Sequence, residues 1–447
     1  MKIKLNRYLL RYFPPGIIIE YEDENMNIYH KSIDLINLNA ETDLDSLASA
    51  IILEEPLLDR GPTTLRRTQL KFLLNTLLQK IESAWRRQKF SPYLEIEAHA
   101  APITCMDVDK HGTRILTASE DGKANLFDVV TGKQLMCFEG HSNVVNCATF
   151  NRPFSFLVAT ASFDKTTRIW DSEKGMLLYK LAGHEQEIIK LQFNPNGTDL
   201  ATGSLDHTAC IWDVETGKMV LRLDSHGREV VDLNYDHEGK KLITASVDRT
   251  ARVWDIRTGK CMHTLNKHKS ELSCATIDFV GDYYLTASRD KTAILWDAKT
   301  GKPWEISKGF KGEMITAEFS PSGDRFVAAS DQTVKIFSVR TGALIGVLDG
   351  HDEEVVGAGW NAAGTKLYTL SGQKITLWDA ETFEEMTVLT GHTKNLMMMR
   401  FNYEGDIIVS VGNDNICKVW KDNEAKIKAV PDNDVLGEEA RLVDKPI

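Results

Sequence analysis

An aromatic residue recurs along this sequence at a nearly constant interval, and this repeat constrains the fold more than any other feature. Separated by 41 to 43 residues, the positions are Phe127, Trp170, Trp212, Trp254, Trp296, Phe337, Trp378 and Trp420. A period of about 40 residues is typical of arrays in which each small unit buries its hydrophobic face against its neighbours. The sequence therefore predicts eight such units.

Two further marks accompany each aromatic residue. About 28 residues before it stand His99, His141, His184, His226, His268, Phe310, His351 and His392. Six residues before it stand Asp121, Asp164, Asp206, Asp248, Asp290, Asp331, Gly372 and Asp414. Between these marks lie short alternating β-branched runs and Thr-Gly-Lys turns, which favour antiparallel hairpins. Residues 93–420 thus resemble a WD40 array, and the resemblance implies an all-β fold, an eight-bladed WD40 β-propeller with four strands per blade.

Such a ring must close, because an open end would expose a sheet edge able to pair with other chains. Trp420 ends the third strand of the last blade, so the fourth strand must come from elsewhere. Residues 93–97 stand where an outermost strand should, directly before His99. We therefore expect 93–421 to form the propeller, with 93–97 completing blade eight.

The region before the ring, residues 1–90, is expected to be a small α+β domain. Leu9–Tyr21 predicts strand, turn and strand, Asp43–Leu53 a short helix, and Thr63–Arg87 a longer helix with an apolar stripe. The stripe is expected to pack against its own hairpin or the ring, with a groove for a partner helix as the alternative. Residues 422–447 are charged and poor in apolar residues, which predicts a flexible tail.

Four blades carry a complete set of His, Ser, Asp and Trp. The sets are His141, Ser162, Asp164 and Trp170; His184, Ser204, Asp206 and Trp212; His226, Ser246, Asp248 and Trp254; and His268, Ser288, Asp290 and Trp296. An enzyme needs one catalytic triad, not one every 42 residues, whereas every blade needs residues that hold its strands together. The repetition therefore favours a structural role. We expect Asp to accept bonds from His and from its turn, and Ser to link His to the indole N–H. Blades six and seven, with Phe310, Phe337 and Gly372, are expected to be softer.

No enzymatic motif accompanies the repeats. The sequence has no phosphate-binding loop, no nucleophile elbow, and no His or Cys pairs at metal-ligand spacing, so we expect no catalysis, no metal and no cofactor. The net charge of −11 argues against nucleic acid as a partner. Uncharged runs are too short for a membrane span, and the start lacks the apolar core of a signal peptide, so we expect an intracellular chain.

Protein contact is the remaining expectation. The residues before the turn aspartates in consecutive blades, Phe163, Leu205 and Val247, predict an apolar arc bounded by Arg289. The basic residues Lys2, Lys4, Arg7 and Arg11, like Arg66 and Arg67, form either a solvated face or a docking site for an acidic segment.

The region before the ring resembles a known family. LLRYFPPGIIIEYE at 9–22, KSIDL at 31–35 and Thr42-Asp43 resemble the small leading domain of outer-dynein-arm assembly factors with WD repeats. That resemblance implies a monomeric, non-catalytic adaptor that links preassembled outer-arm dynein to a subunit of intraflagellar transport complex B. It also implies a location in the cytoplasm and the cilium or flagellum, at the axoneme and basal body.

Two other functions stay open. Trp254-Asp255-Ile256-Arg257 matches the WDxR box of propellers that serve as substrate receptors for cullin-RING ubiquitin ligases. A generic WD40 scaffold or a dynein regulator of the lissencephaly type would also bind proteins, although the latter resembles a seven-bladed ring behind a dimerising helix.

Overall fold

The computed structural model describes residues 4–11, 15–22, 28–35, 38, 42–54, 70–79, 88–152, 154–307 and 309–423. The chain divides into two compact units, with the boundary between Arg87 and Gln88. Each unit is described by itself.

The first unit contains a three-stranded antiparallel sheet in the order β1 (Lys4–Arg11), β2 (Gly16–Glu22) and β3 (Ile28–Asp34). The sequence predicts only the first two of these strands. Helix α1 spans Leu44–Glu54, one residue later at each end than expected, because the Asp43 carboxylate caps it by accepting a bond from the Asp45 N–H.

Residues 70–79 are helical, within the longer helix that the sequence predicts, and the rest of that prediction lies outside the described residues. Leu70, Leu74 and Leu77 from this helix are buried in one cluster with Ile17 and Ile19 of β2. The apolar stripe is therefore core of its own small domain, as far as it is described.

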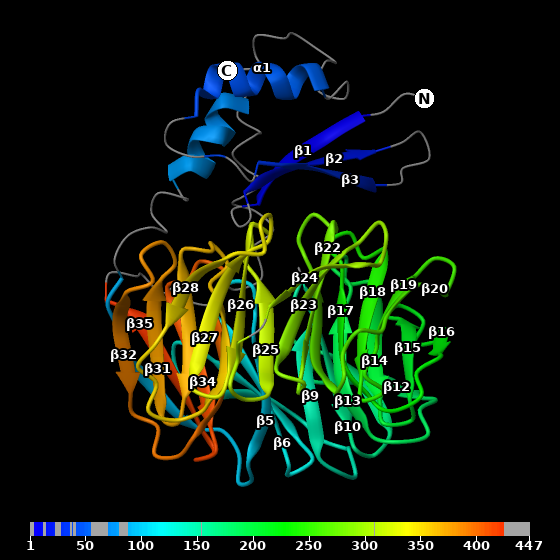
Figure 1. The fold of residues 1–447 in the computed structure, drawn as a ribbon. Coiled ribbons are helices and arrows are strands. Elements are labelled where there is room, and N and C mark those ends of the chain that lie inside the picture. The colour runs from blue at the N-terminus through cyan, green and yellow to red at the C-terminus, as the bar shows by residue number, and fades with distance from the viewer. Residues whose placement is uncertain are drawn as a thin grey trace. The chain divides into compact units, whose positions relative to one another are not determined.

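The second unit is a ring of eight four-stranded antiparallel sheets, which stand side by side in Figure 1. Blades one to four are β5 (Ile103–Val108), β6 (Arg114–Ser119), β7 (Ala124–Asp128), β8 (Gln134–Phe138); β9 (Val145–Phe150), β10 (Leu157–Ser162), β11 (Thr166–Asp171), β12 (Leu177–Ala182); β13 (Ile188–Phe193), β14 (Asp199–Ser204), β15 (Thr208–Asp213), β16 (Met219–Asp224); and β17 (Val230–Tyr235), β18 (Lys241–Ser246), β19 (Ala251–Asp255), β20 (Lys260–Leu265).

Blades five to eight follow the same plan, except for the origin of the last strand. They are β21 (Leu272–Ile277), β22 (Tyr283–Ser288), β23 (Thr292–Asp297), β24 (Pro303–Ser307); β25 (Met314–Phe319), β26 (Arg325–Ser330), β27 (Thr333–Ser338), β28 (Leu344–Leu348); β29 (Val355–Trp360), β30 (Lys366–Ser371), β31 (Lys374–Asp379), β32 (Glu385–Thr390); and β33 (Leu396–Phe401), β34 (Ile407–Gly412), β35 (Ile416–Asp422), β4 (Phe90–Glu97).

Burial along the strands explains the layered ring. The second strands, such as β14, are buried almost throughout because both faces pack against neighbouring blades. The fourth strands β12 and β16 are mostly exposed, with one buried residue each, Leu181 and Leu223, as expected for strands on the outer wall. The first strands of neighbouring blades contact each other around the whole ring, from β5 and β9 to β33 and β5. The eight-bladed all-β propeller that the repeat predicts is confirmed.

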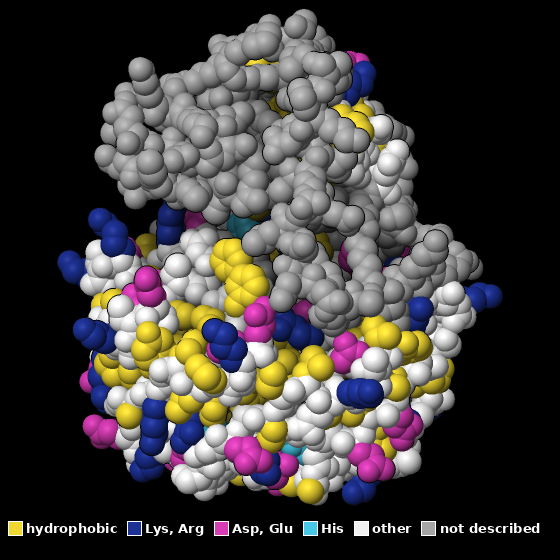
Figure 2. Space-filling view, turned by 180° about the vertical axis from the view of Figure 1, so that it is seen from behind, with side chains coloured by type: hydrophobic (Ala, Val, Ile, Leu, Met, Phe, Trp, Pro, Cys, Tyr) yellow, Lys and Arg dark blue, Asp and Glu magenta, His cyan; other side chains and the backbone are white. Residues whose placement is uncertain are grey.

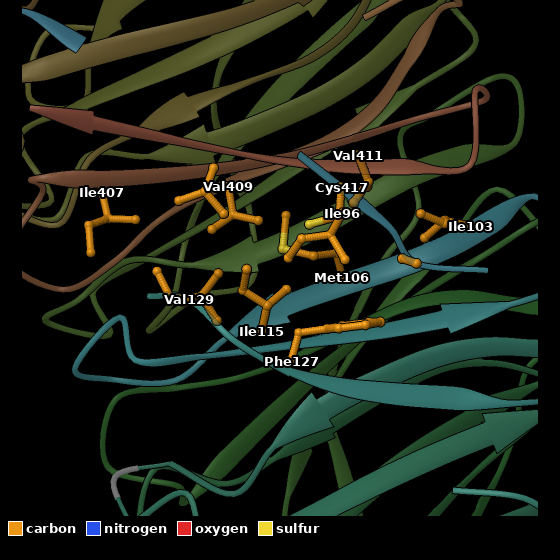
Figure 3. Close-up of a cluster of buried hydrophobic side chains, with 13 residues drawn as sticks. Ile96, Ile103, Met106, Ile115, Phe127, Val129, Ile407, Val409, Val411 and Cys417 are labelled. Carbon is orange, nitrogen blue, oxygen red and sulfur yellow. The ribbon is translucent and has the colours of Figure 1, made fainter. Parts of the chain in front are cut away.

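The ring closes through a strand from its own beginning. β4 pairs antiparallel with β35, with Ile96 opposite Cys417 and Phe90 opposite Asp422. Figure 3 shows the core at this seam, where Ile96 and Cys417 from the last blade pack with Met106 of the first. The closing strand is longer than the expected 93–97, because the pairing continues back to Phe90.

Candidate partner-binding face

The repeated polar residues form a chain of hydrogen bonds inside each of blades two to five. In blade three the His184 Nδ1 lies 2.7 Å from Asp206 Oδ2, and its Nε2 lies 2.8 Å from Thr202 Oγ1. The indole N–H of Trp212 donates to the same Thr202 oxygen at 2.9 Å. A carboxylate only accepts, so Nδ1 carries the imidazole proton, and Nε2 then accepts from the threonine hydroxyl. Both imidazole nitrogens and the indole N–H are therefore hydrogen-bonded.

The serine of each set does not make the link that the sequence analysis expected. Ser204 Oγ accepts from the Asp206 backbone N–H at 3.1 Å and donates to the Gln186 carbonyl, which fixes the turn instead. The linking hydroxyl belongs to the threonine two residues earlier. The same geometry recurs at Thr160, Thr244 and Thr286. The sequence does contain a repeated Thr-x-Ser-x-Asp pattern that could have indicated this threonine. In this pattern the threonine lies on the same strand face as the serine.

Electrostatics agrees with a structural role for these groups. Burial alone would raise the pKa of Asp206, but hydrogen bonds from His184 and Thr208 hold that pKa far below its ordinary value. Burial lowers the pKa of His141 and His268, so both imidazoles are neutral near pH 7. A locked neutral histidine whose two nitrogens are occupied has no free lone pair for acid–base chemistry.

In blade six, apolar residues replace the histidine, threonine and tryptophan of this hydrogen-bond network. Phe310 stands for the histidine, Ala328 for the threonine and Phe337 for the tryptophan, and all three are buried in one cluster. The Phe310 and Phe337 ring centroids lie 6.2 Å apart. Removing all the polar partners together leaves no nitrogen at these positions unpaired, so the substitutions are mutually consistent. That blade six is softer than its neighbours stays a prediction.

Blades six and seven differ from the others in one more way, because the hairpin between their second and third strands is a residue shorter. Ser330 pairs directly with Thr333, and Ser371 with Lys374, whereas three residues separate Ser204 from Thr208 in blade three. The deletion accounts for the 41-residue spacings of Phe337 and Trp378. Because no turn aspartate reaches it, His351 Nδ1 lies 3.2 Å from the Gln332 carbonyl instead.

The predicted apolar arc lies on the ring face that carries these hairpins. Phe163, Leu205 and Val247 are half-buried, and each backbone N–H donates to a carbonyl in the loop that enters the first strand of its blade. The Arg289 side chain is 57% exposed and is paired with Glu271 at 3.3 Å and with Glu313 at 3.6 Å. The four residues occupy equivalent sites on blades two to five, and their role in binding stays a prediction.

The basic candidates of the small domain divide into three groups. Lys2, Arg66 and Arg67 lie outside the described residues, and Lys4 and Arg7 lie in β1 with side chains that are not described. Arg11 forms an ion pair of 2.5 Å with Asp34 and a hydrogen bond with Ser32, and its side chain is only 11% exposed. Arg11 therefore holds β1 to β3, and this pairing argues against its expected role as a docking residue.

Hydrophobic side chains also gather on the outer wall of the ring, a feature that the sequence analysis missed. Figure 2 shows them as a band on one side of the described molecule. The exposed set on the fourth strands of blades one to three is Leu135, Leu177, Leu178, Met219 and Val220. In the sequence, apolar pairs at the start of the fourth strands, such as Met219-Val220 directly after the turn at 216–218, could have indicated this surface.

The described residues contain no group of three or more His, Cys, Asp or Glu side chains placed to hold a metal ion. None of the helices described is both long enough and apolar enough to cross a bilayer.

Comparison with known proteins agrees with this geometry. The family model of the Nucleolar protein 10-like N-terminal domain, a β-propeller, matches residues 89–282, and the model of the WD domain, G-beta repeat, matches 306–338 and 383–421. The ring is a WD40 propeller. The propeller also resembles the crystal structure of the computationally designed Ika8 protein, with a TM-score of 0.67 and 25% identity over 74% of this chain and 99% of that chain.

The curated relatives of this WD40 propeller carry one recurring name. "Dynein assembly factor with WD repeat domains 1" is 38% identical in Macaca fascicularis and in Homo sapiens, and 37% identical in Danio rerio, over 196 residues. Each match covers 44% of this chain and 46% of the relative, so the chain spans about half the length of the curated relatives it matches. The expected resemblance to dynein assembly factors is confirmed.

Proposed function

We propose that this protein is a non-catalytic adaptor in dynein assembly, which links preassembled outer-arm dynein to intraflagellar transport complex B for import into cilia or flagella. The observation that carries the proposal is the similarity to relatives named dynein assembly factors. The hydrogen-bond chains support a non-catalytic role, because they use the histidines and aspartates to hold each blade together.

Two surfaces divide the work in this proposal. The small domain, with the hairpin of β1 and β2, shapes the site for a transport complex B subunit, and a surface of the propeller holds dynein. The arc of Phe163, Leu205 and Val247 is the candidate for the second surface, because apolar side chains at equivalent sites on consecutive blades give a continuous contact area. The adaptor acts in the cytoplasm and the cilium.

The test is affinity capture of the tagged full chain from ciliated cells, followed by mass spectrometry. We expect outer-arm dynein and transport complex B subunits with the wild-type chain. Deleting residues 1–87, which leaves β4 and the closed ring, should remove the transport complex and keep dynein. A truncated ring that still captures the transport complex at full strength would refute the role of the small domain.

The dynein surface has its own matched pair of variants. Replacing both Leu205 and Val247 by Asp should reduce dynein capture at least about tenfold, as the loss of central interface contacts does. Val220→Asp, at a 56% exposed site on the outer wall, is the control and should not change it. Equal loss in both variants would contradict the assignment of the arc.

A ubiquitin-ligase receptor is the second candidate, because Arg257 of the WDxR box is exposed. Asp255 of the same box already has a structural task, since its carboxylate accepts the Thr258 N–H and closes the turn. Capture of a ligase adaptor that is lost in Arg257→Ala would support this second function over the first.

A further inference from the structure

The shortened hairpin of blade seven leaves a space that the complete blades fill. In blade three the Asp206 carboxylate occupies the position beside His184. In blade seven the turn holds only Gly372 and Gln373, and Gly372 has a φ of +55°, in the left-handed region. A Cβ at Gly372 would lie 2.5 Å from the Glu353 carboxyl carbon, so that acidic side chain stands where a larger turn residue would be.

The result is a pocket of about 240 Å³ on blade seven. Its lining includes His351, Glu353, Lys374, Trp378, Glu385 and His392. Pockets for drug-sized ligands are larger, about 300–1,000 Å³. The pocket therefore has room for one long side chain or a similarly small ligand. The rings of His351 and Trp378, whose centroids lie 5.6 Å apart, give it an aromatic wall.

The charge of the lining is negative. Lys374 Nζ lies 2.6 Å from Asp352 Oδ2, so this cation is neutralised by its neighbour. Glu353 and Glu385 are exposed carboxylates on opposite sides of the shortened hairpin in the sequence. Burial lowers the pKa of His351 and of His392, so neither imidazole supplies a compensating positive charge at neutral pH. Two carboxylates remain without a cation among the lining residues.

We propose that this pocket binds the guanidinium side chain of an arginine in a partner protein. A planar, permanently charged group fits a negatively charged lining and lies well against aromatic rings, which a compact ammonium group does less well. An anionic ligand would meet two unpaired carboxylates and a lysine already held by Asp352. The proposal goes beyond the adaptor function, because it fixes the chemistry that a partner must present and holds whichever partner that is.

The experiment measures binding of Nα-acetylarginine methylamide to the full chain by ligand-observed NMR. The citrulline analogue, which has the same shape without the charge, is the matched ligand, and inorganic phosphate is the anionic probe. We expect the arginine probe to bind at least about tenfold more tightly than the citrulline analogue, and phosphate not to compete with it.

The variants locate the site. Glu353→Gln combined with Glu385→Gln should weaken arginine binding about tenfold, as two exposed ion pairs together can. Glu381→Gln combined with Glu384→Gln, on the same blade outside the lining, should leave it unchanged. Both variants should melt as the wild type does, because all four side chains are exposed. No arginine binding, equal binding of citrulline, competition by phosphate, or binding that survives the first variant would each overturn the proposal.

Discussion

Replacing the linking threonine by its isostere valine tests the hydrogen-bond chain of blade three directly. Thr202 is fully buried, donates to His184 Nε2 at 2.8 Å and accepts from Trp212 Nε1 at 2.9 Å. Valine keeps the volume and removes both bonds. An unpaired buried polar group costs about 1–3 kcal/mol, so leaving both the imidazole nitrogen and the indole N–H unpaired should lower the free energy of unfolding by about 2–6 kcal/mol.

The assay is urea unfolding followed by tryptophan fluorescence, with hydrogen exchange to report whether blade three opens first. Ser204→Ala is the matched control, because Ser204 bonds only to backbone groups of its own turn and loop and should cost about 1 kcal/mol. If Thr202→Val were no more destabilising than Ser204→Ala, threonine would not be the link and the description of the network would be wrong.

Three further predictions concern the same ring. His184→Phe, Thr202→Ala and Trp212→Phe together reproduce the residues of blade six. In urea unfolding, this triple variant should lose less stability than the summed losses of the three single variants. Strict additivity would contradict the mutual dependence of the three residues. Ile96→Asp on β4 should open the seam of blade eight and expose β35 to hydrogen exchange, because Ile96 is 6% exposed in the core at the closure; full protection of β35 would contradict the closure. The free energy of unfolding should fall as the pH drops below about 6.5, because histidines take up protons in the unfolded chain but stay neutral where burial lowers their pKa in the folded chain. The loss is up to about 1.4 kcal/mol per pH unit for each such histidine. A melting temperature that does not change from pH 7 to 5 would count against this. The histidines concerned are His141, His268, His351 and His392.

The sequence was sufficient for the ring because each blade repeats the same solution. Regular spacing of Trp212, Trp254 and Trp296 determines the unit. Because Trp420 ends the third strand of the last blade, ring closure requires a fourth strand from elsewhere, and β4 supplies it. The third strand of the small domain, Ile28–Asp34, was missed because it has no repeat to mark it, and only its pairing with β2 reveals it.

The site was less predictable than the fold. Threonine and serine occupy alternate positions on one strand face, so composition alone could not tell which hydroxyl faces the imidazole and which faces the turn. The pocket of blade seven depends on the loss of one residue in a hairpin, which the sequence shows only as a 41-residue interval. The effect of this deletion becomes clear only in the structure, where the Glu353 side chain lies beside Gly372.

Under the proposed function, this propeller acts by binding, and its cargo is outer-arm dynein. The most direct measurement is quantitative capture by the full chain from ciliated cells, with the Leu205→Asp and Val247→Asp double variant and the Val220→Asp control processed in parallel. We expect dynein subunits to be enriched with the wild type and the control and depleted with the double variant. A capture in which dynein is absent from all three samples would contradict it.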